Sequence, residues 1–66
     1  MTFSIYSDSK NEFRWRLRAA NGQIIAVSGE GYVRKADCQH AIQLVKSHAP
    51  SASINDETAA HSAYGR

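Results

Sequence analysis

Large apolar residues alternate with polar ones in two segments near the start of the chain, 2–6 and 12–19. The alternating apolar positions are Phe3 and Ile5 in the first segment and Phe13, Trp15 and Leu17 in the second. A period of two is typical of a β-strand that buries one face. The pattern therefore predicts two strands, joined by the polar, turn-forming residues 7–11.

A third strand is predicted after Asn21-Gly22, where Ile24 begins a short aliphatic run. Two loops can make this hairpin, and they differ in register. A two-residue turn pairs Leu17 with Ala26. A three-residue loop over 20–22 instead pairs Leu17 with Ile25 and Trp15 with Val27. The second option gathers the large apolar side chains on one face, so we predict the three-residue loop with Gly22 left-handed.

Spacings of three and four replace the alternation after residues 28–31, which break the strand. The segment from Lys35 to His48 carries one helical stripe of apolar residues, which continues to residue 49. Its members are Cys38, Ala41, Ile42, Val45 and Ala49. This periodicity predicts an amphipathic helix. Pro50 ends it, and Leu44 lies off the stripe as a candidate for an edge or subunit contact. The fold class is therefore α+β: a β-β-β-α unit whose antiparallel sheet packs against one helix.

Composition changes after Pro50, where Ile54 is the only aliphatic residue larger than alanine. We expect one domain over 1–50, with a possible short extended segment to 56. Residues 57–66 are expected to form a disordered tail.

A chain of 66 residues can build only a marginal core. Small folds usually add disulfides, a metal or a second subunit. Cys38 is the single cysteine, so no disulfide can form within the chain. A lone thiol, no secretion signal and no long apolar run predict a cytoplasmic protein that does not enter membranes.

The motifs Phe3-Ser4-Ile5-Tyr6, Phe13-Arg14-Trp15-Arg16-Leu17-Arg18-Ala19-Ala20-Asn21-Gly22, Gly29-Glu30-Gly31-Tyr32 and Lys35-Ala36-Asp37-Cys38 occur in this order. Over residues 3–56 they closely resemble the YegP-like family, small bacterial proteins of unknown function. The resemblance implies a β-β-β-α unit that occurs as tandem repeats or as a single copy, and hence a homodimer for a single-copy chain. Two positions depart from the family's pattern: Arg34 stands where Ser or Thr would cap the helix, and Leu44 stands at a usually polar position. Losing such a cap costs about 1 kcal/mol.

The residues lead to a dimer by a separate route. One helix on three strands leaves sheet edges unpaired, and an unpaired edge can accept another chain. Pairing two copies would remove edges and enlarge the core, with or without exchange of a strand.

The candidate ligand surface consists of Arg14, Arg16 and Arg18, which share one strand face at intervals of about 6–7 Å. Such a row fits the backbone of an extended nucleic-acid strand. It also fits the solvated face of an amphipathic strand, because arginine stems readily cover apolar surface. The aromatic residues of this strand, Phe13 and Trp15, point to the other side, which favours the second interpretation. Only Tyr6, Tyr32 and Tyr64 are left as aromatic residues that a nucleic acid could reach.

Three further residues suggest metal or thiol chemistry, but their spacing opposes it. His40 and His48 lie about 12 Å apart along a helix and point in different directions. Cys38 lies on the apolar stripe with no base on its own helix face, as a small buried residue would. We expect no catalytic residue, cofactor or metal.

The charge is mildly basic, at +2, which permits anionic partners without requiring them. Our leading hypothesis is a non-enzymatic, cytoplasmic, homodimeric module that interacts with an unknown macromolecule. The alternative is low-specificity binding of nucleic acid through Arg14, Arg16 and Arg18. An enzyme ranks third, since no acid–base pair or activated nucleophile is visible in the sequence.

Overall fold

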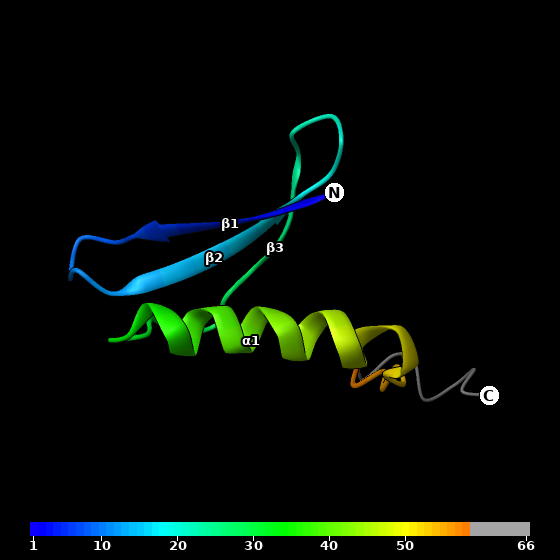
Figure 1. Ribbon diagram of the computed structural model, residues 1–66. Helices are drawn as coiled ribbons and strands as arrows, with labels where there is room; N and C mark the ends of the chain where they lie inside the picture. The colour runs from blue at the N-terminus through cyan, green and yellow to red at the C-terminus, as the bar shows by residue number, and fades with distance from the viewer. Residues whose placement is uncertain (59–66) are drawn as a thin grey trace.

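The computed structural model of this chain describes residues 1–58 and has the predicted α+β architecture (Figure 1). Its elements, in chain order, are β1 (Thr2–Ser7), β2 (Phe13–Arg18), β3 (Ile24–Val27), α1 (Lys35–His48) and the short 3₁₀ turn η1 (Ala49–Ser51). The three strands form one antiparallel sheet in the order β1-β2-β3. The helix bounds are those that the apolar stripe predicted.

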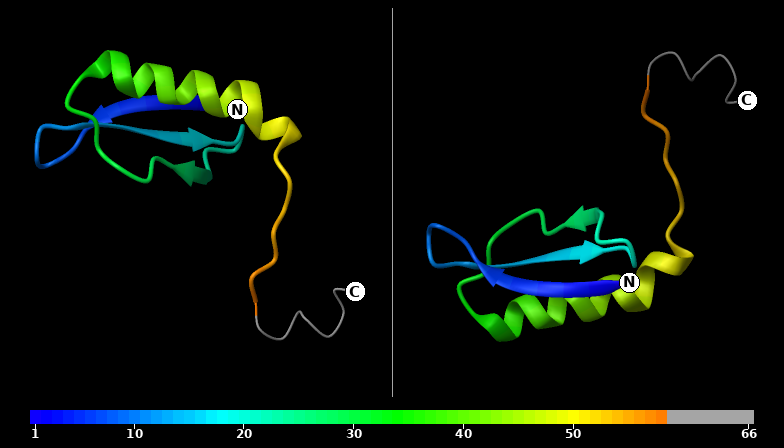
Figure 2. Two further views of the ribbon diagram at one scale, coloured as in Figure 1. Left: turned by 90° about the horizontal axis from the view of Figure 1, so that it is seen from below. Right: turned by 90° about the horizontal axis from the view of Figure 1, so that it is seen from above.

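The core lies between the sheet and α1, which runs along one face of the sheet (Figures 1 and 2). Trp15, Cys38 and Ile42 are its buried residues. Phe3 meets the Trp15 ring edge-on, with 5.3 Å between ring centroids. Half-buried apolar residues surround this centre: Phe3, Ile5, Phe13, Leu17, Ala26, Tyr32 and Val45. Three buried side chains make a small core, as expected for a chain of this length.

The loop between β2 and β3 is the predicted three-residue loop. The Ala19 amide donates to the Gln23 carbonyl at 2.9 Å, and the Gly22 amide donates back to the Ala19 carbonyl at 2.9 Å. Gly22 has φ of +89°, a conformation that glycine adopts without steric cost. The Asn-Gly signal therefore located the turn correctly.

The register beyond the loop differs from the prediction. Leu17 pairs with Ala26, and not with Ile25, because a bulge shifts the pairing between Leu17 and Arg18. A bulge places one extra residue on one strand, so the register set by the loop holds only for the first pair. Ala26 consequently packs on the core, while Ile25 and Val27 are 52% and 56% exposed. The prediction that Ile25 and Val27 would join the core was wrong.

The helix begins without a side-chain cap, as the arginine at its N-cap position predicted. Arg34 has extended backbone angles, φ −109° and ψ 136°, and makes no capping hydrogen bond. Cys38, Ile42 and Val45 face the sheet, and Leu44 is 46% exposed on another side.

Residues 52–58 follow η1 without regular secondary structure and lead away from the sheet and helix (Figure 2). Ile54 is 96% exposed there. The predicted disordered tail, 57–66, falls mostly outside the described residues. Over residues 1–58, no helix is long and apolar enough to cross a membrane.

Candidate ligand-binding face of the sheet

One face of the sheet is turned away from α1, and we call it the open face. The strand pairing assigns to it the residues that alternate with the core positions: Thr2, Ser4, Tyr6, Arg14, Arg16, Arg18, Ile24 and Val27. The arginines form the middle row on β2. Hydroxyl-bearing residues of β1 flank them on one side and aliphatic residues of β3 on the other. The predicted arginine row is therefore present on one face.

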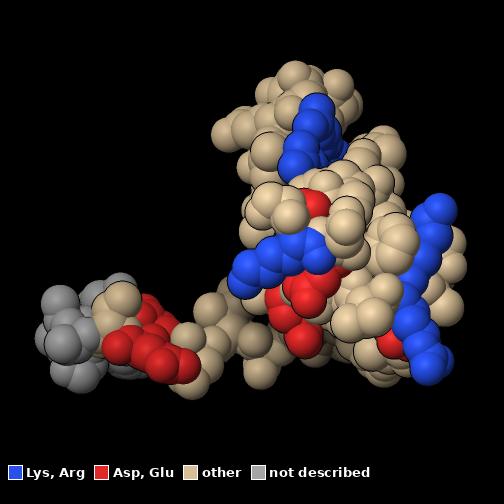
Figure 3. All heavy atoms as spheres, turned by 90° about the vertical axis from the view of Figure 1, so that its left-hand side faces the viewer, with Lys and Arg blue, Asp and Glu red and all other residues tan. Residues whose placement is uncertain are grey.

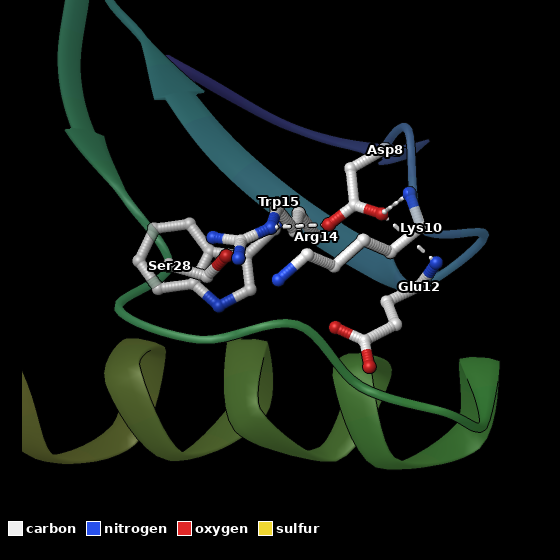
Figure 4. A network of polar contacts seen from close by, with 6 residues as sticks. All are labelled: Asp8, Lys10, Glu12, Arg14, Trp15 and Ser28. Carbon is white, nitrogen blue, oxygen red and sulfur yellow. Dashed lines mark hydrogen bonds and ion pairs between the residues drawn. The ribbon is translucent and has the colours of Figure 1, made fainter.

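Arg14 is engaged within the protein (Figure 4). Its Nε donates to Oδ2 of Asp8 at 2.6 Å. The other carboxylate oxygen of Asp8 accepts the main-chain amides of Lys10 and Glu12 at 2.8 and 3.0 Å, which fixes the β1–β2 turn. The hydrogen bond from Arg14 lowers the pKa of Asp8, and the same bond raises the pKa of Arg14. Arg14 therefore helps to order a turn.

Arg16 lies on an aromatic ring. Its guanidinium carbon is 3.9 Å from the centroid of the Tyr6 ring, within the range of a cation–π contact. Arg16 Nε is buried and has no hydrogen-bond partner, so the stem is packed down on the sheet. Arg16 and Tyr6 together place a cationic group over an aromatic ring on this face.

Arg18 ends β2 and is exposed. It pairs with Thr2 on one side and Ile24 on the other. The three arginines thus differ: one is ion-paired, one is stacked and one extends into solvent. Seen from the end of the molecule, basic side chains lie in separate groups with acidic ones between them (Figure 3).

The residues weighed for metal or thiol chemistry are not brought together. Cys38 is fully buried, and burial raises the pKa of its thiol. His40 and His48 are exposed. Among residues 1–58 no group of three His, Cys, Asp or Glu side chains could hold a metal ion.

The sequence did not indicate an apolar groove that lies between β1, β2 and the end of α1. Its volume is about 730 Å³, and the residues that line it include Met1, Phe3, Leu17, Val45 and Pro50. The sequence pattern assigns the apolar residues of the strands and helix to the core, and only their arrangement in space reveals that the core is open at this end.

Asp8 was missed as a part of the arginine face, whereas Tyr6 was predicted only as a reachable aromatic residue and not as a neighbour of Arg16. Alternation along β1 could have placed Tyr6 with Ser4 on the side opposite Phe3 and Ile5. Asp8 carried only a turn signal. Its pairing with Arg14 depends on how the turn folds back over the sheet, and no sequence spacing encodes that.

Residues 8–56 match a family model described as a domain of unknown function, DUF1508. The chain belongs to this family. A UPF0339 protein of Neisseria meningitidis serogroup B is 62% identical over 47 residues, which are 71% of this chain and 82% of that protein. UPF0339 proteins of Treponema denticola and Methanosarcina acetivorans are 50% and 52% identical, each over 79% of this chain and 88% of theirs.

A solved structure also resembles this fold. The solution structure of a protein from Haloferax volcanii has a TM-score of 0.79 and 40% sequence identity, covering 83% of this chain and 92% of that one. The two chains therefore share one fold. The family includes archaeal members, so the expectation of a bacterial family was too narrow.

Proposed function

We propose that this DUF1508 protein is a non-enzymatic, cytoplasmic interaction module that works as a homodimer. We also propose that DUF1508 and the YegP-like family are one family. The main support for the dimer comes from the segment 52–56. It lies inside the span that matches the family model, yet every one of its residues is exposed.

The size of the core supports this proposal. With three buried apolar side chains among residues 1–58, the unit has little apolar burial to offset the entropy of folding. At the same time Ile25, Val27, Leu44 and Ile54 are each 46% exposed or more. A second copy of the chain is the partner best placed to cover these residues, because it is present wherever the protein is made.

The sheet edge offers a place for the second copy. Strand β3 has only four residues, and its outer edge has no partner strand within residues 1–58. Unpaired edges readily accept an extended segment. We propose that residues 52–56 of one copy lie extended against the other copy, so that Ile54 is buried by its partner.

A matched pair of variants tests this arrangement. Ile54→Asp places a charge in the proposed interface, whereas Ser53→Asp places the same charge one position earlier in the same segment. We expect light scattering at micromolar concentration to give a dimer for Ser53→Asp and the unmodified chain, and a monomer or unfolded chain for Ile54→Asp. A dimer of unchanged affinity in Ile54→Asp would refute the arrangement.

The proposal that this protein is not an enzyme rests on the chemistry of its side chains. Within the described residues the one thiol is buried with a raised pKa, and no base is paired with it. A preorganised acid, base and nucleophile are what catalysis needs. Turnover of a substrate by the purified protein, abolished by one substitution at an exposed polar residue, would overturn this part of the proposal.

A second candidate function, low-specificity binding of nucleic acid through Arg14, Arg16 and Arg18, is favoured by one observation. Arg16 and Tyr6 stack on the open face. Stacked aromatic and guanidinium groups are the surfaces on which proteins hold unpaired bases. Steep loss of affinity for an oligonucleotide with rising salt is expected, and no binding at low salt would eliminate this candidate.

A further inference from the structure

We propose that the open face binds single-stranded nucleic acid through Tyr6, Arg16 and Arg18, and that Arg14 takes no part. This inference rests on the second candidate function and deepens it. It assigns the ligand class, and it divides three arginines that the sequence presents as equivalent.

The division follows from how each guanidinium is engaged. Arg14 already has a carboxylate partner, Asp8, so a phosphate would have to displace an existing ion pair. Arg16 contacts a ring and Arg18 is exposed, and the structure gives neither of them an ion-pair partner within residues 1–58. Both can therefore meet a phosphate without breaking an ion pair.

The spacing of the two available arginines suits an extended strand. Alternate residues of a β-strand lie about 6.6–6.8 Å apart, comparable to the distance between phosphates in a stretched single strand. Because Arg16 and Arg18 share one face of β2, they can contact successive phosphates. The ligand would then run along β2.

Tyr6 and Arg16 supply a surface for a base. A guanidinium 3.9 Å above the ring centroid covers one side of the ring with a second planar group, and a base can stack on that pair. Val27 pairs with Arg16 and is 56% exposed, so an apolar edge lies beside the stack. Stacking of this kind requires unpaired bases.

The shape of the face also favours a single strand over a duplex. Proteins that read a duplex usually insert a protruding helix or two-stranded ribbon into a groove, whereas the open face is one side of a three-stranded sheet. Asp8 lies at the end of this face and is already paired with Arg14. Repulsion of a polyanion is thus reduced where the face would otherwise be acidic.

The test is fluorescence anisotropy of the full chain with a labelled oligothymidine, and with a duplex of equal length. We expect Arg16→Gln and Arg18→Gln each to weaken single-strand binding severalfold and to lower the salt slope by about one. Tyr6→Leu should weaken it about tenfold or more, and Tyr6→Phe, which keeps the ring, should not. Arg14→Gln is the matched control on the same strand, and Arg34→Gln removes the same charge at the start of the helix.

Each other outcome is decisive. Equal losses in all four arginine variants, with equal binding of the duplex, would mean binding by net charge, which refutes the inference and leaves the second candidate function standing. No binding at about 50 mM salt refutes both. Competition by an acidic peptide that outmatches the oligonucleotide would assign the face to a protein partner and refute the inference. Circular dichroism of every variant checks folding. If Tyr6→Leu unfolds, the binding of Arg18→Gln, a change at an exposed residue, provides the test.

Discussion

Ser28 follows the last residue of β3 and continues the hydrogen bonding to β2 with its side chain. Replacing it by alanine should destabilise the protein. Ser28 is 4% exposed. Its hydroxyl accepts the Trp15 amide at 3.2 Å, and its own amide donates to the Trp15 carbonyl at 2.9 Å. In a regular antiparallel ladder a main-chain carbonyl would accept the Trp15 amide. The Ser28→Ala variant keeps the second bond and loses the first.

The expected cost is that of a buried amide left without an acceptor, about 1–3 kcal/mol. A domain of this size melts about 4–8 °C lower for each kcal/mol lost, so we expect the melting temperature to fall by roughly 8–16 °C for a central cost of about 2 kcal/mol. This is a large share of the roughly 3–5 kcal/mol that so small a core supplies.

The assay is thermal melting followed by tryptophan fluorescence, because Trp15 is the only tryptophan and lies at the centre of the core. All samples need one protein concentration, since association makes the melting temperature depend on it. Ser9→Ala, in the exposed β1–β2 turn, is the control. A Ser28→Ala melting temperature equal to that of the control would refute the role given to this hydroxyl.

Three further predictions concern the turn, the strand-to-helix loop and the buried thiol. Arg14 lowers the pKa of Asp8, so the stability that Asp8 contributes is present above its ordinary pKa of 3.8 and is lost as pH falls through its lower pKa in the folded state. The urea midpoint of unfolding should fall over that pH range, and it should fall less in Asp8→Asn. An equal pH dependence of the midpoint in both proteins would contradict the pairing. Gly31→Ala should destabilise more than Gly29→Ala, because a Cβ at Gly31 would lie 2.9 Å from a carbon of the Glu12 side chain while one at Gly29 meets nothing within 4 Å; equal urea midpoints would contradict this. Cys38 should react with a thiol reagent only as the protein unfolds in urea, because it is fully buried with a raised pKa, and rapid labelling without urea would contradict its placement.

Local signals predicted the elements of this fold well. The stripe from Cys38 to Ala49 predicted the helix, because a period of 3.6 residues is a strong signal over fourteen residues. Gly22 predicted the hairpin loop, because few residues adopt positive φ. Both signals act over short stretches of chain.

The register of β3 was mispredicted for a different reason. Burial of the largest aliphatic residues favoured pairing Leu17 with Ile25, but the bulge between the strands gives that place to Ala26. Whether a bulge forms depends on how the strands twist over the helix, so a pairwise rule of hydrophobic matching misses it. The ion pair between Arg14 and Asp8 was missed for the same reason, because it joins a turn to a strand and depends on how the two come together in space.

The candidate face was predicted in its location and not in its chemistry. Alternation placed Arg14, Arg16 and Arg18 on one side of β2, and the structure agrees. Their separate environments come from Asp8 and Tyr6, which approach from β1 and its turn. Such neighbours are fixed by tertiary structure, so the sequence could offer three arginines without ranking them.

The homodimer is the central claim, and sedimentation equilibrium of the unmodified chain at micromolar concentration tests it most directly. One copy has a mass of 7.3 kDa. We predict a single folded species of twice that mass, with a melting temperature that rises with protein concentration. A folded monomer of 7.3 kDa, with a melting temperature independent of concentration, would contradict the claim.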